Sequence, residues 1–199
     1  MYHPAHVLLR ASSRCAISGT LWPSARDYEP GVFPGLVQTP DYARAVHEGA
    51  MPRLSARVID ERIEVRRIRQ NLLYKDEPTT LDAVIDEAVL HRIVGGPAVM
   101  RRQIDRVIEA CSLPNVTVRV IPFSAGAHPA LDSTFIILEQ RPPVASVVHV
   151  EGLVGQIYLE RPQDVQRYMQ VFDRLSSLAL DSAESKDLML RISAKYEEV

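Results

Sequence analysis

A histidine and a glutamate two residues apart are the best candidates for acid–base chemistry in this 199-residue chain. His149 and Glu151 lie at the end of a run that reads VVHVE, residues 147–151. On a regular strand, residues two apart project from the same face, so the two side chains would be neighbours. Burial moves the pKa values of a carboxyl group and an imidazole toward neutrality, where they can exchange protons. The alternatives are that both side chains only tie down loops, or that His149 is exposed on a sheet edge.

Two other residues could take part in the same chemistry. His128 lies in the loop PFSAGAHPALD, and Glu87 follows an apolar run. If the chain is an enzyme, its candidate acids and bases are Glu151, His149, His128 and Glu87. We predict no metal site, because these residues lack the short ligand spacings of metal motifs. We also predict no cofactor, because the sequence contains no GxGxxG, P-loop, HExxH or GxSxG motif.

Composition narrows the classes of protein to consider. The chain is 46% hydrophobic and 24% charged, which is ordinary for a globular protein, and its net charge is -2. A DNA-binding domain is usually basic, so we expect no direct DNA binding by this chain. No apolar run approaches the roughly 20 residues of a membrane helix. The two cysteines, Cys15 and Cys111, form no CxxC motif, and the N-terminus lacks the apolar core of a secretory signal, so we expect a cytoplasmic protein.

Short β-branched runs predict the sheet that would position these residues. We expect strands at 116–121, 134–138 and 147–150, and further strands at 81–85 and 153–159. Loops of roughly ten residues join the first three, which favours antiparallel pairing of consecutive runs. We expect helices at 40–47, 53–74, 87–93, 97–111, 162–178 and from 182 onward. The fold class is therefore α+β, with a small antiparallel or mixed sheet of about four to five strands and about five to six helices.

The helix expected at 53–74 carries two stripes at helical spacing. Its apolar stripe would face the core and contains Leu54, Val58, Val65, Ile68 and Leu72. Its second stripe contains Arg62, Arg66 and Arg69, at positions i, i+4 and i+7. These arginines form either a solvated face with salt bridges or a surface that binds an anion or a partner.

Two segments near the N-terminus show no strand or helix period. We interpret residues 1–26 as a poorly ordered or loosely docked lead-in and residues 27–199 as a single α+β domain. The segment 28–38 contains two prolines and two glycines among large apolar residues. This composition opposes both a helix and a central strand, so we expect an ordered, partly buried loop.

Several motifs taken together resemble an actinobacterial domain of unknown function. The family pattern "yEp…PGLLQT..YAra" is matched at Glu29, Pro30, Pro34, Gly35, Leu36, Gln38, Thr39, Tyr42 and Ala43. Further matches are Arg66, Arg69, Gln70 and Leu73, then Asp86, Glu87, Leu90, Arg92, Val94, Gly95, Gly96 and Gln103. The segments 115–128, 135–139 and 147–151 also match, with His149 where the family usually has tyrosine. The resemblance covers about residues 27–195.

That domain usually follows a helix-turn-helix of the xenobiotic-response-element type in transcriptional regulators. The resemblance therefore implies the half of a regulator that senses a ligand or partner, or that mediates dimerisation. The 27 residues before Tyr28 hold no paired amphipathic helices for a helix-turn-helix. The chain is then either a stand-alone domain, or a piece of a longer regulator whose DNA-binding half is missing.

We expect a stand-alone ligand-sensing or protein-interaction domain that modulates transcription indirectly. The loops 29–38 and 122–128 would line a pocket beside the sheet. Ligand contacts are expected from Glu29, Gln38, Tyr42, Arg69, Arg92, Phe123, Phe135 and Tyr158. The expected partners are a small molecule, together with either a second copy of the chain or a full-length regulator. The alternative is a small biosynthetic enzyme of the cyclase, isomerase or lyase type, using the same pocket.

Overall fold

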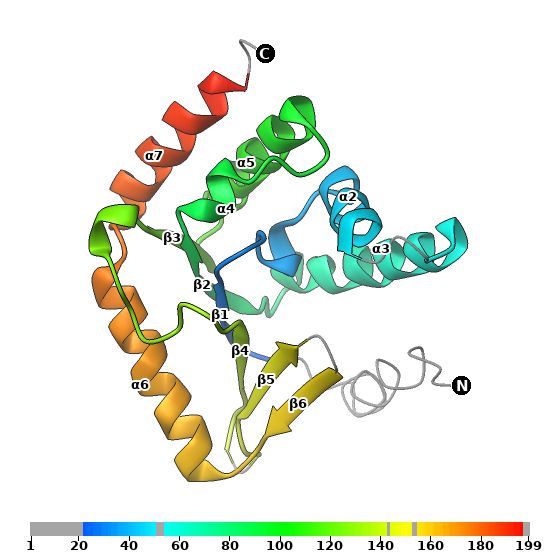
Figure 1. Ribbon diagram of the computed structural model, residues 1–199. Coiled ribbons are helices and arrows are strands. Elements are labelled where there is room, and N and C mark those ends of the chain that lie inside the picture. Colours follow the sequence, from blue (N-terminus) through cyan, green and yellow to red (C-terminus); the bar gives the residue numbers. More distant parts are fainter. Residues whose placement is uncertain (1–21, 51–53, 143, 153–154, 197–199) are drawn as a thin grey trace.

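The protein is built on a mixed six-stranded sheet, with strand order β3-β2-β1-β4-β5-β6 (Figure 1). The computed structural model describes residues 22–50, 54–142, 144–152 and 155–196. The strands are β1 (Ser24–Glu29), β2 (Thr80–Asp86), β3 (Val116–Ile121), β4 (Phe135–Glu139), β5 (Val147–Gly152) and β6 (Gly155–Leu159). Strand β2 pairs parallel with both β1 and β3. The pairs β1–β4, β4–β5 and β5–β6 are antiparallel. The α+β prediction is confirmed, with six strands instead of four to five.

Helical crossovers connect the parallel strands, as parallel pairing requires. Helices α2 (Pro40–Ala50) and α3 (Ala56–Gln70) lie between β1 and β2 in the chain. Helices α4 (Ala88–His91) and α5 (Pro97–Ala110) lie between β2 and β3. Because β2 and β1 separate β3 from β4 in the sheet, the expected antiparallel pairing of the runs 116–121 and 134–138 is wrong.

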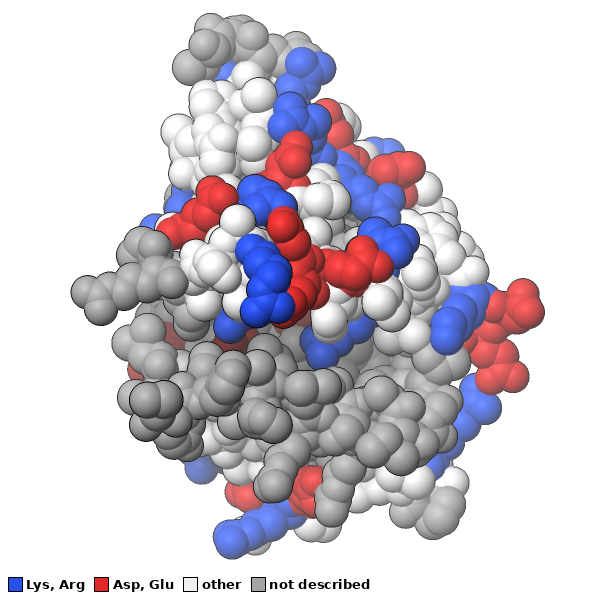
Figure 2. Space-filling view, turned by 90° about the vertical axis from the view of Figure 1, so that its right-hand side faces the viewer, with Lys and Arg blue, Asp and Glu red and all other residues white. Residues whose placement is uncertain are grey.

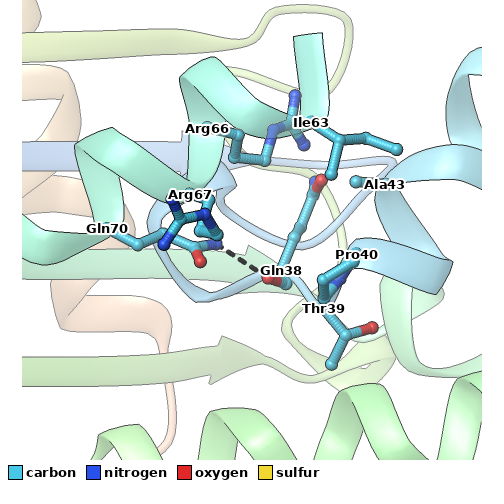
Figure 3. Close-up of a pocket in the computed structure, with 8 residues that line it drawn as sticks. All are labelled: Gln38, Thr39, Pro40, Ala43, Ile63, Arg66, Arg67 and Gln70. Carbon is cyan, nitrogen blue, oxygen red and sulfur yellow. Dashed lines mark hydrogen bonds between the residues drawn. The ribbon is translucent and has the colours of Figure 1, made fainter. Parts of the chain in front are cut away.

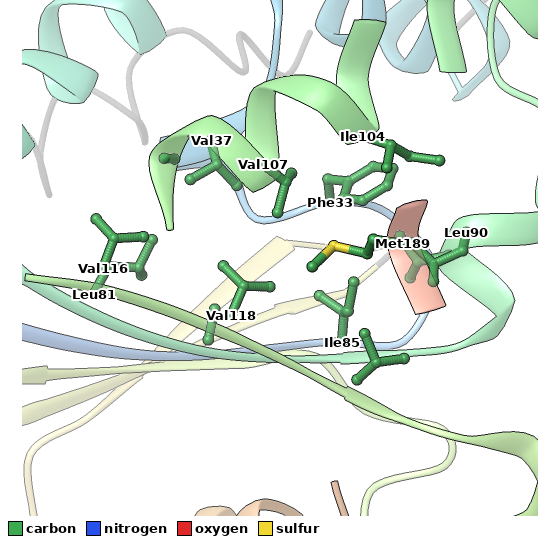
Figure 4. Close-up of a cluster of buried hydrophobic side chains, with 14 of the residues drawn as sticks. Phe33, Val37, Leu81, Ile85, Leu90, Ile104, Val107, Val116, Val118 and Met189 are labelled. Atoms are coloured by element: carbon green, nitrogen blue, oxygen red, sulfur yellow. The ribbon is translucent and has the colours of Figure 1, made fainter. Parts of the chain in front are cut away.

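Helices cover both faces of the sheet and enclose two apolar cores. The larger core lies under α5 and α7 (Ser182–Lys195), where Ile104, Val107 and Met189 meet side chains of β2 and β3 (Figure 4). The smaller core lies on the opposite face under α6 (Pro162–Leu178). Five side chains of α6 at helical spacing lie in it or pack against it: Val165, Tyr168, Met169, Phe172 and Leu175.

The chain between α6 and α7 closes the β3 edge of the sheet. Leu180 N–H donates to the carbonyl of Val120 at 2.9 Å, and Val120 N–H donates to Ser185 Oγ at 3.0 Å. Asp181 then caps α7, accepting from Glu184 N–H at 2.8 Å while the Glu184 carboxylate accepts from Asp181 N–H. This capping box satisfies backbone N–H groups at the start of α7 that would otherwise lack a partner.

Strand β1 corrects the interpretation of the N-terminal segments. Residues 24–29 form a central strand between β2 and β4, whereas we had expected a lead-in to residue 26 and a loop from 28. The run SARDYE contains no β-branched residue, and two carboxylates occupy positions that a core strand normally gives to apolar side chains. The ordered loop begins only at Pro30. Residues 1–21, the rest of the expected lead-in, lie outside the described part of the chain.

Helix α3 is the second correction, because its apolar stripe does not face the core. Val65 is 48% exposed and Ile68 is 56% exposed, and Ile59 is the one residue of α3 that is fully buried. The helix instead turns Arg66 toward the sheet, as described below. None of the helices in the described part of the chain is long and apolar enough to cross a membrane.

Candidate functional site

Two carboxyl groups of β1, the buried Asp27 and the partly buried Glu29, project from the sheet face that carries α2 and α3. Asp27 is 2% exposed, and its Oδ1 has no hydrogen-bond partner in the described part of the chain. Burial raises the pKa of Asp27 from 3.8 to about 7. Glu29 projects from the same face, two residues later. Its pKa is raised well above the usual value, first by burial and then by Asp27 and Glu151, although Thr134 Oγ1 donates to Glu29 Oε2 at 2.9 Å.

Arg66, from the arginine stripe of α3, interacts electrostatically with Glu29 of β1 and with Glu151 of β5. Arg66 is partly buried, and its Nη1 atom is buried without a hydrogen-bond partner among the described residues. Burial lowers the pKa of Arg66, and the neighbouring Arg69 and Arg62 lower it further, whereas Glu151 and Glu29 raise it. Of the two interpretations of the stripe, a solvated face does not fit Arg66. A buried guanidinium group beside buried carboxyl groups fits it instead.

Strand β5 adds His149 and Glu151 to the same arrangement. In the sheet register His149 pairs with Ile136, which in turn pairs with Asp27, so all three share a face. Burial lowers the pKa of His149, while Glu151 and a hydrogen bond with Gln156 raise it. The imidazole Nε2 is buried without a partner among the described residues, and Glu151 is exposed. The structure thus brings the predicted acid–base pair together on one face.

We call this arrangement the charged cluster. It consists of Asp27, Glu29, Arg62, Arg66, Arg69, His149 and Glu151. The face of the molecule at the right of Figure 1 shows Lys and Arg side chains interspersed with Asp and Glu (Figure 2). On α3 itself, Arg57 pairs with Glu61 and Arg67 pairs with Glu64. Arg66 therefore differs from the paired surface arginines of its own helix.

Helix α2 closes one side of the charged cluster. Burial lowers the pKa of His47 to about 4, and Arg66 and Arg62 add to this effect. Tyr42 is fully buried against Phe33, and burial raises its pKa to about 12. Both side chains are therefore neutral at neutral pH, so they add no charge next to the arginines.

A small cavity adjoins Arg66 on the side of the loop that leads into α2 (Figure 3). Its volume is about 10 Å³, enough for about one water molecule. It is lined by Gln38, Thr39, Pro40, Ala43, Ile63, Arg66, Arg67 and Gln70. The Gln38 amide donates to the Phe33 carbonyl at 2.5 Å and leaves its Oε1 buried without a partner among the described residues. Gln70 holds the loop by donating to the carbonyls of Gln38 and Gly35, at 2.7 and 3.1 Å.

A second polar group lies on the other face of β1, at the end of the parallel strands. His128 Nε2 lies 3.4 Å from the Tyr28 hydroxyl and 3.7 Å from Asp86 Oδ2. His128 Nδ1 is buried without a partner in the described chain. Burial raises the pKa of Tyr28, and the Asp86 carboxylate raises it further. The Tyr28 phenol is therefore not activated as an acid or a nucleophile.

The structure divides the four candidate acids and bases between these two groups. His149 and Glu151 belong to the charged cluster, and His128 contacts Tyr28 on the opposite face of β1. Glu87 Oε2 accepts from Phe123 N–H at 2.7 Å and fixes the start of the 122–128 loop. Of the loops 29–38 and 122–128, which were expected to line one pocket, only the first contributes to the cavity beside Arg66.

The expected ligand contacts are divided as well. Glu29 and Arg69 lie in the charged cluster, Tyr42 borders it, and Arg92 acts electrostatically on Tyr42. Gln38 lines the cavity. Tyr158 packs its ring 5.0 Å from the ring of His149.

The two phenylalanines on that list lie elsewhere. Phe135 is buried between Tyr28 and Tyr168, so it is a core residue and not a ligand contact. Phe123 is exposed and stacks on His91.

Sequence reasoning did not single out Asp27 and His47, and it treated Arg66 as one of three equivalent arginines. The sequence did contain a signal for this site. Three arginines at helical spacing, Arg62, Arg66 and Arg69, occur together with two acidic residues at alternating positions, Asp27 and Glu29. Within the described residues, no group of three or more His, Cys, Asp or Glu side chains could hold a metal ion.

Comparison with known families gives one result. Residues 23–191 match the model of a domain of unknown function, DUF5753. No curated protein and no solved structure matches the chain. Because the match covers most of its length, the chain belongs to the DUF5753 family.

Proposed function

We propose that the protein is a ligand-sensing domain that binds a small polar molecule at the charged cluster. The observation that carries the proposal is the pair of unsatisfied buried atoms, Arg66 Nη1 and Asp27 Oδ1. Leaving a buried polar atom without a partner costs about 1–3 kcal/mol, and more for a charged group. A ligand that supplies a partner to either atom would recover part of this free energy. The unliganded protein is less stable because these buried atoms lack partners, and ligand binding would restore that stability.

The resemblance to the domains that follow a helix-turn-helix supports a role in regulation. In this proposal the protein acts in the cytoplasm and modulates transcription indirectly, through a second copy of itself or a full-length regulator. Occupancy of the charged cluster would change how α3 packs on the sheet. Helix α3 can respond in this way because its apolar residues contribute little to the core.

Native mass spectrometry tests the proposal directly. The purified protein is incubated with a small-molecule extract of the producing cells, and bound species are identified by their added mass. We expect a bound species with the wild-type protein and with Arg57→Gln, because Arg57 is an exposed arginine of the same helix. We expect loss of that species with Arg66→Gln. Equal binding by Arg66→Gln would place the site elsewhere.

The His149–Glu151 pair supports a second candidate, a small enzyme of the cyclase, isomerase or lyase type. Its supporting observation is that burial lowers the pKa of the partly buried His149 imidazole against the opposing effect of Glu151, and that its Nε2 has no partner among the described residues. Metabolites consumed by the wild-type protein but not by His149→Gln would be identified by mass spectrometry. Consumption that continues unchanged in His149→Gln would exclude this pair as the acid–base catalyst.

A further inference from the structure

We propose that the cavity beside Arg66 binds a hydroxyl group of the ligand, which accepts a hydrogen bond from Arg66 Nη1 and donates one to Gln38 Oε1. This inference rests on the proposed function and names a functional group that the ligand must carry. It depends on two buried atoms of opposite hydrogen-bonding character that belong to the lining of one small space.

The two atoms belong to side chains that approach the cavity from different elements. Gln38 lies in the loop before α2 and is 4% exposed, and Arg66 lies on α3. Both residues line the cavity, and the Gln38 side chain extends from the loop toward the guanidinium group of Arg66 (Figure 3). Gln38 Oε1 and Arg66 Nη1 are each buried without a partner among the described residues. The cavity therefore presents one acceptor and one donor.

Hydrogen bonds fix which atom of the Gln38 amide faces the cavity. The amide nitrogen donates to the Phe33 carbonyl at 2.5 Å. A carbonyl only accepts, so turning the amide over would set two acceptor oxygens against each other. The loop itself is held by Gln70, which donates to the Gln38 carbonyl at 2.7 Å, and by Gln103, which accepts from Thr39 N–H at 2.7 Å. The acceptor is thus in place before any ligand arrives.

A hydroxyl group matches this pair of atoms in size and in chemistry. The cavity of about 10 Å³ has room for about one water molecule, so a single oxygen atom with its hydrogen fits. A carboxylate oxygen could accept from Arg66 but has no proton to donate to Gln38. An ammonium group could donate to Gln38 but would be repelled by the guanidinium group. A methyl group would leave both atoms unpaired.

The rest of the ligand would leave the cavity between α2 and α3. Pro40 at the start of α2 and Arg67 on α3 also line the cavity, and both residues are exposed. Arg67 pairs with Glu64 on its own helix, with 2.7 Å between Nη2 and Oε1. The carbon atom that carries the hydroxyl group would therefore point outward between these two exposed residues.

Methanol and acetonitrile are matched probes of this cavity. Methanol can both donate and accept a hydrogen bond, whereas acetonitrile can only accept one. Binding would be measured by NMR titration of the whole chain, through the backbone N–H signals of Thr39, Ala43 and Ile63, which line the cavity. Signals of α6, on the opposite face of the sheet, report general solvent effects. We expect methanol to bind about 2- to 10-fold more tightly than acetonitrile, the range for one neutral hydrogen bond.

Two variants separate the acceptor from the donor. Gln38→Met removes the acceptor and keeps a side chain of similar size, so it should bind both probes equally. Gln166→Met, on the exposed side of α6, should keep the preference for methanol. Arg66→Met removes the donor and should weaken binding of both probes by about 10-fold or more, which keeps the proposal testable if Gln38→Met does not fold. A preference for methanol that survives in Gln38→Met would overturn the proposal.

An ordered water molecule offers the same hydrogen bonds as a hydroxyl group, and the titration distinguishes the two. Saturable shifts with methanol show that an alcohol can take the place of water. If neither probe gives a saturable shift while Overhauser contacts with water appear at the Thr39 and Ala43 N–H groups, the cavity holds an ordered water only and the proposal fails. Equal binding of acetonitrile and methanol to the wild-type protein would also overturn it.

The extract experiment separates this inference from the proposed function. A bound species that Gln38→Met retains and Arg66→Gln loses would overturn the hydroxyl contact while leaving the proposed function in place. Methanol binding with the expected preference, but no bound species from the extract, would support the chemistry of the cavity and contradict the proposed function.

Discussion

Helices α3 and α5 are similar in length and are both crossovers on one face of the sheet, but they pack differently. Helix α5 buries Met100, Gln103, Ile104, Val107 and Ala110, and its N-terminus begins at Pro97. Helix α3 fully buries one residue, Ile59, and turns Arg66 to the sheet. The apolar packing of α5 fixes its position strongly. Helix α3 has less apolar packing, and polar contacts such as the hydrogen bonds from Gln70 to the carbonyls of Gln38 and Gly35 also hold it.

Truncating one isoleucine in each helix should give the largest contrast. Ile104→Ala removes a fully buried side chain and should cost about 2–5 kcal/mol of unfolding free energy. Ile68→Ala removes a side chain that is 56% exposed and should change stability by no more than about 0.5 kcal/mol. Urea unfolding followed by circular dichroism would measure both. Equal losses would show that the packing of α3 is as tight as that of α5.

The Asp27→Asn variant should reveal the charges under α3 through the pH dependence of stability. The pKa of Asp27 is higher in the folded chain than in the unfolded chain. At pH values between these two pKa values, Asp27 is therefore more protonated in the folded chain than in the unfolded chain. Stability should then fall as the pH rises from about 4 to about 7. The change from 3.8 to about 7 corresponds to at most about 4 kcal/mol. Unfolding free energies at pH 5 and pH 7.5 should show this loss in the wild-type protein and a smaller loss in Asp27→Asn.

The His47→Gln variant should have a smaller effect, with the opposite sign. The folded pKa of His47 is about 4, below its usual 6.5, so stability present above pH 6.5 is lost as the pH falls toward 4. In the wild-type protein, the stability that His47 loses at low pH partly cancels the stability that Asp27 gains there. Melting temperatures at pH 7 and pH 5 should show that His47→Gln loses less stability in acid. An unchanged profile would mean that His47 is solvated in the folded protein.

Much of the fold was predictable because its signals are local. The ranges of α6 and α7 followed from helical periodicity, and β2 and β5 followed from short apolar runs. Strand β1 was missed because Asp27 and Glu29 occupy inward positions, and such positions look like loop residues in a sequence. The cost of burying them is visible only once their surroundings are known.

The candidate site was predictable in part, for a similar reason. The period of a strand places His149 and Glu151 on one face, and a helical spacing groups Arg62 with Arg66 and Arg69. Neither the strand period nor the helical period determines which side of α3 packs against the sheet. The hydrophobic stripe suggested Val65 and Ile68, whereas tertiary packing selected Arg66. The sequence also could not show that His128 and Glu87 lie apart from the other two candidates.

The two hydrogen bonds that join Val120 to Leu180 and Ser185 limit how copies of the protein can meet. They occupy backbone groups that an outer strand would otherwise offer to a neighbouring molecule. A second chain could extend the sheet beyond β3 only after pulling the α6–α7 connection away. The α6–α7 connection thereby protects this edge of the sheet against strand pairing with other copies of the chain.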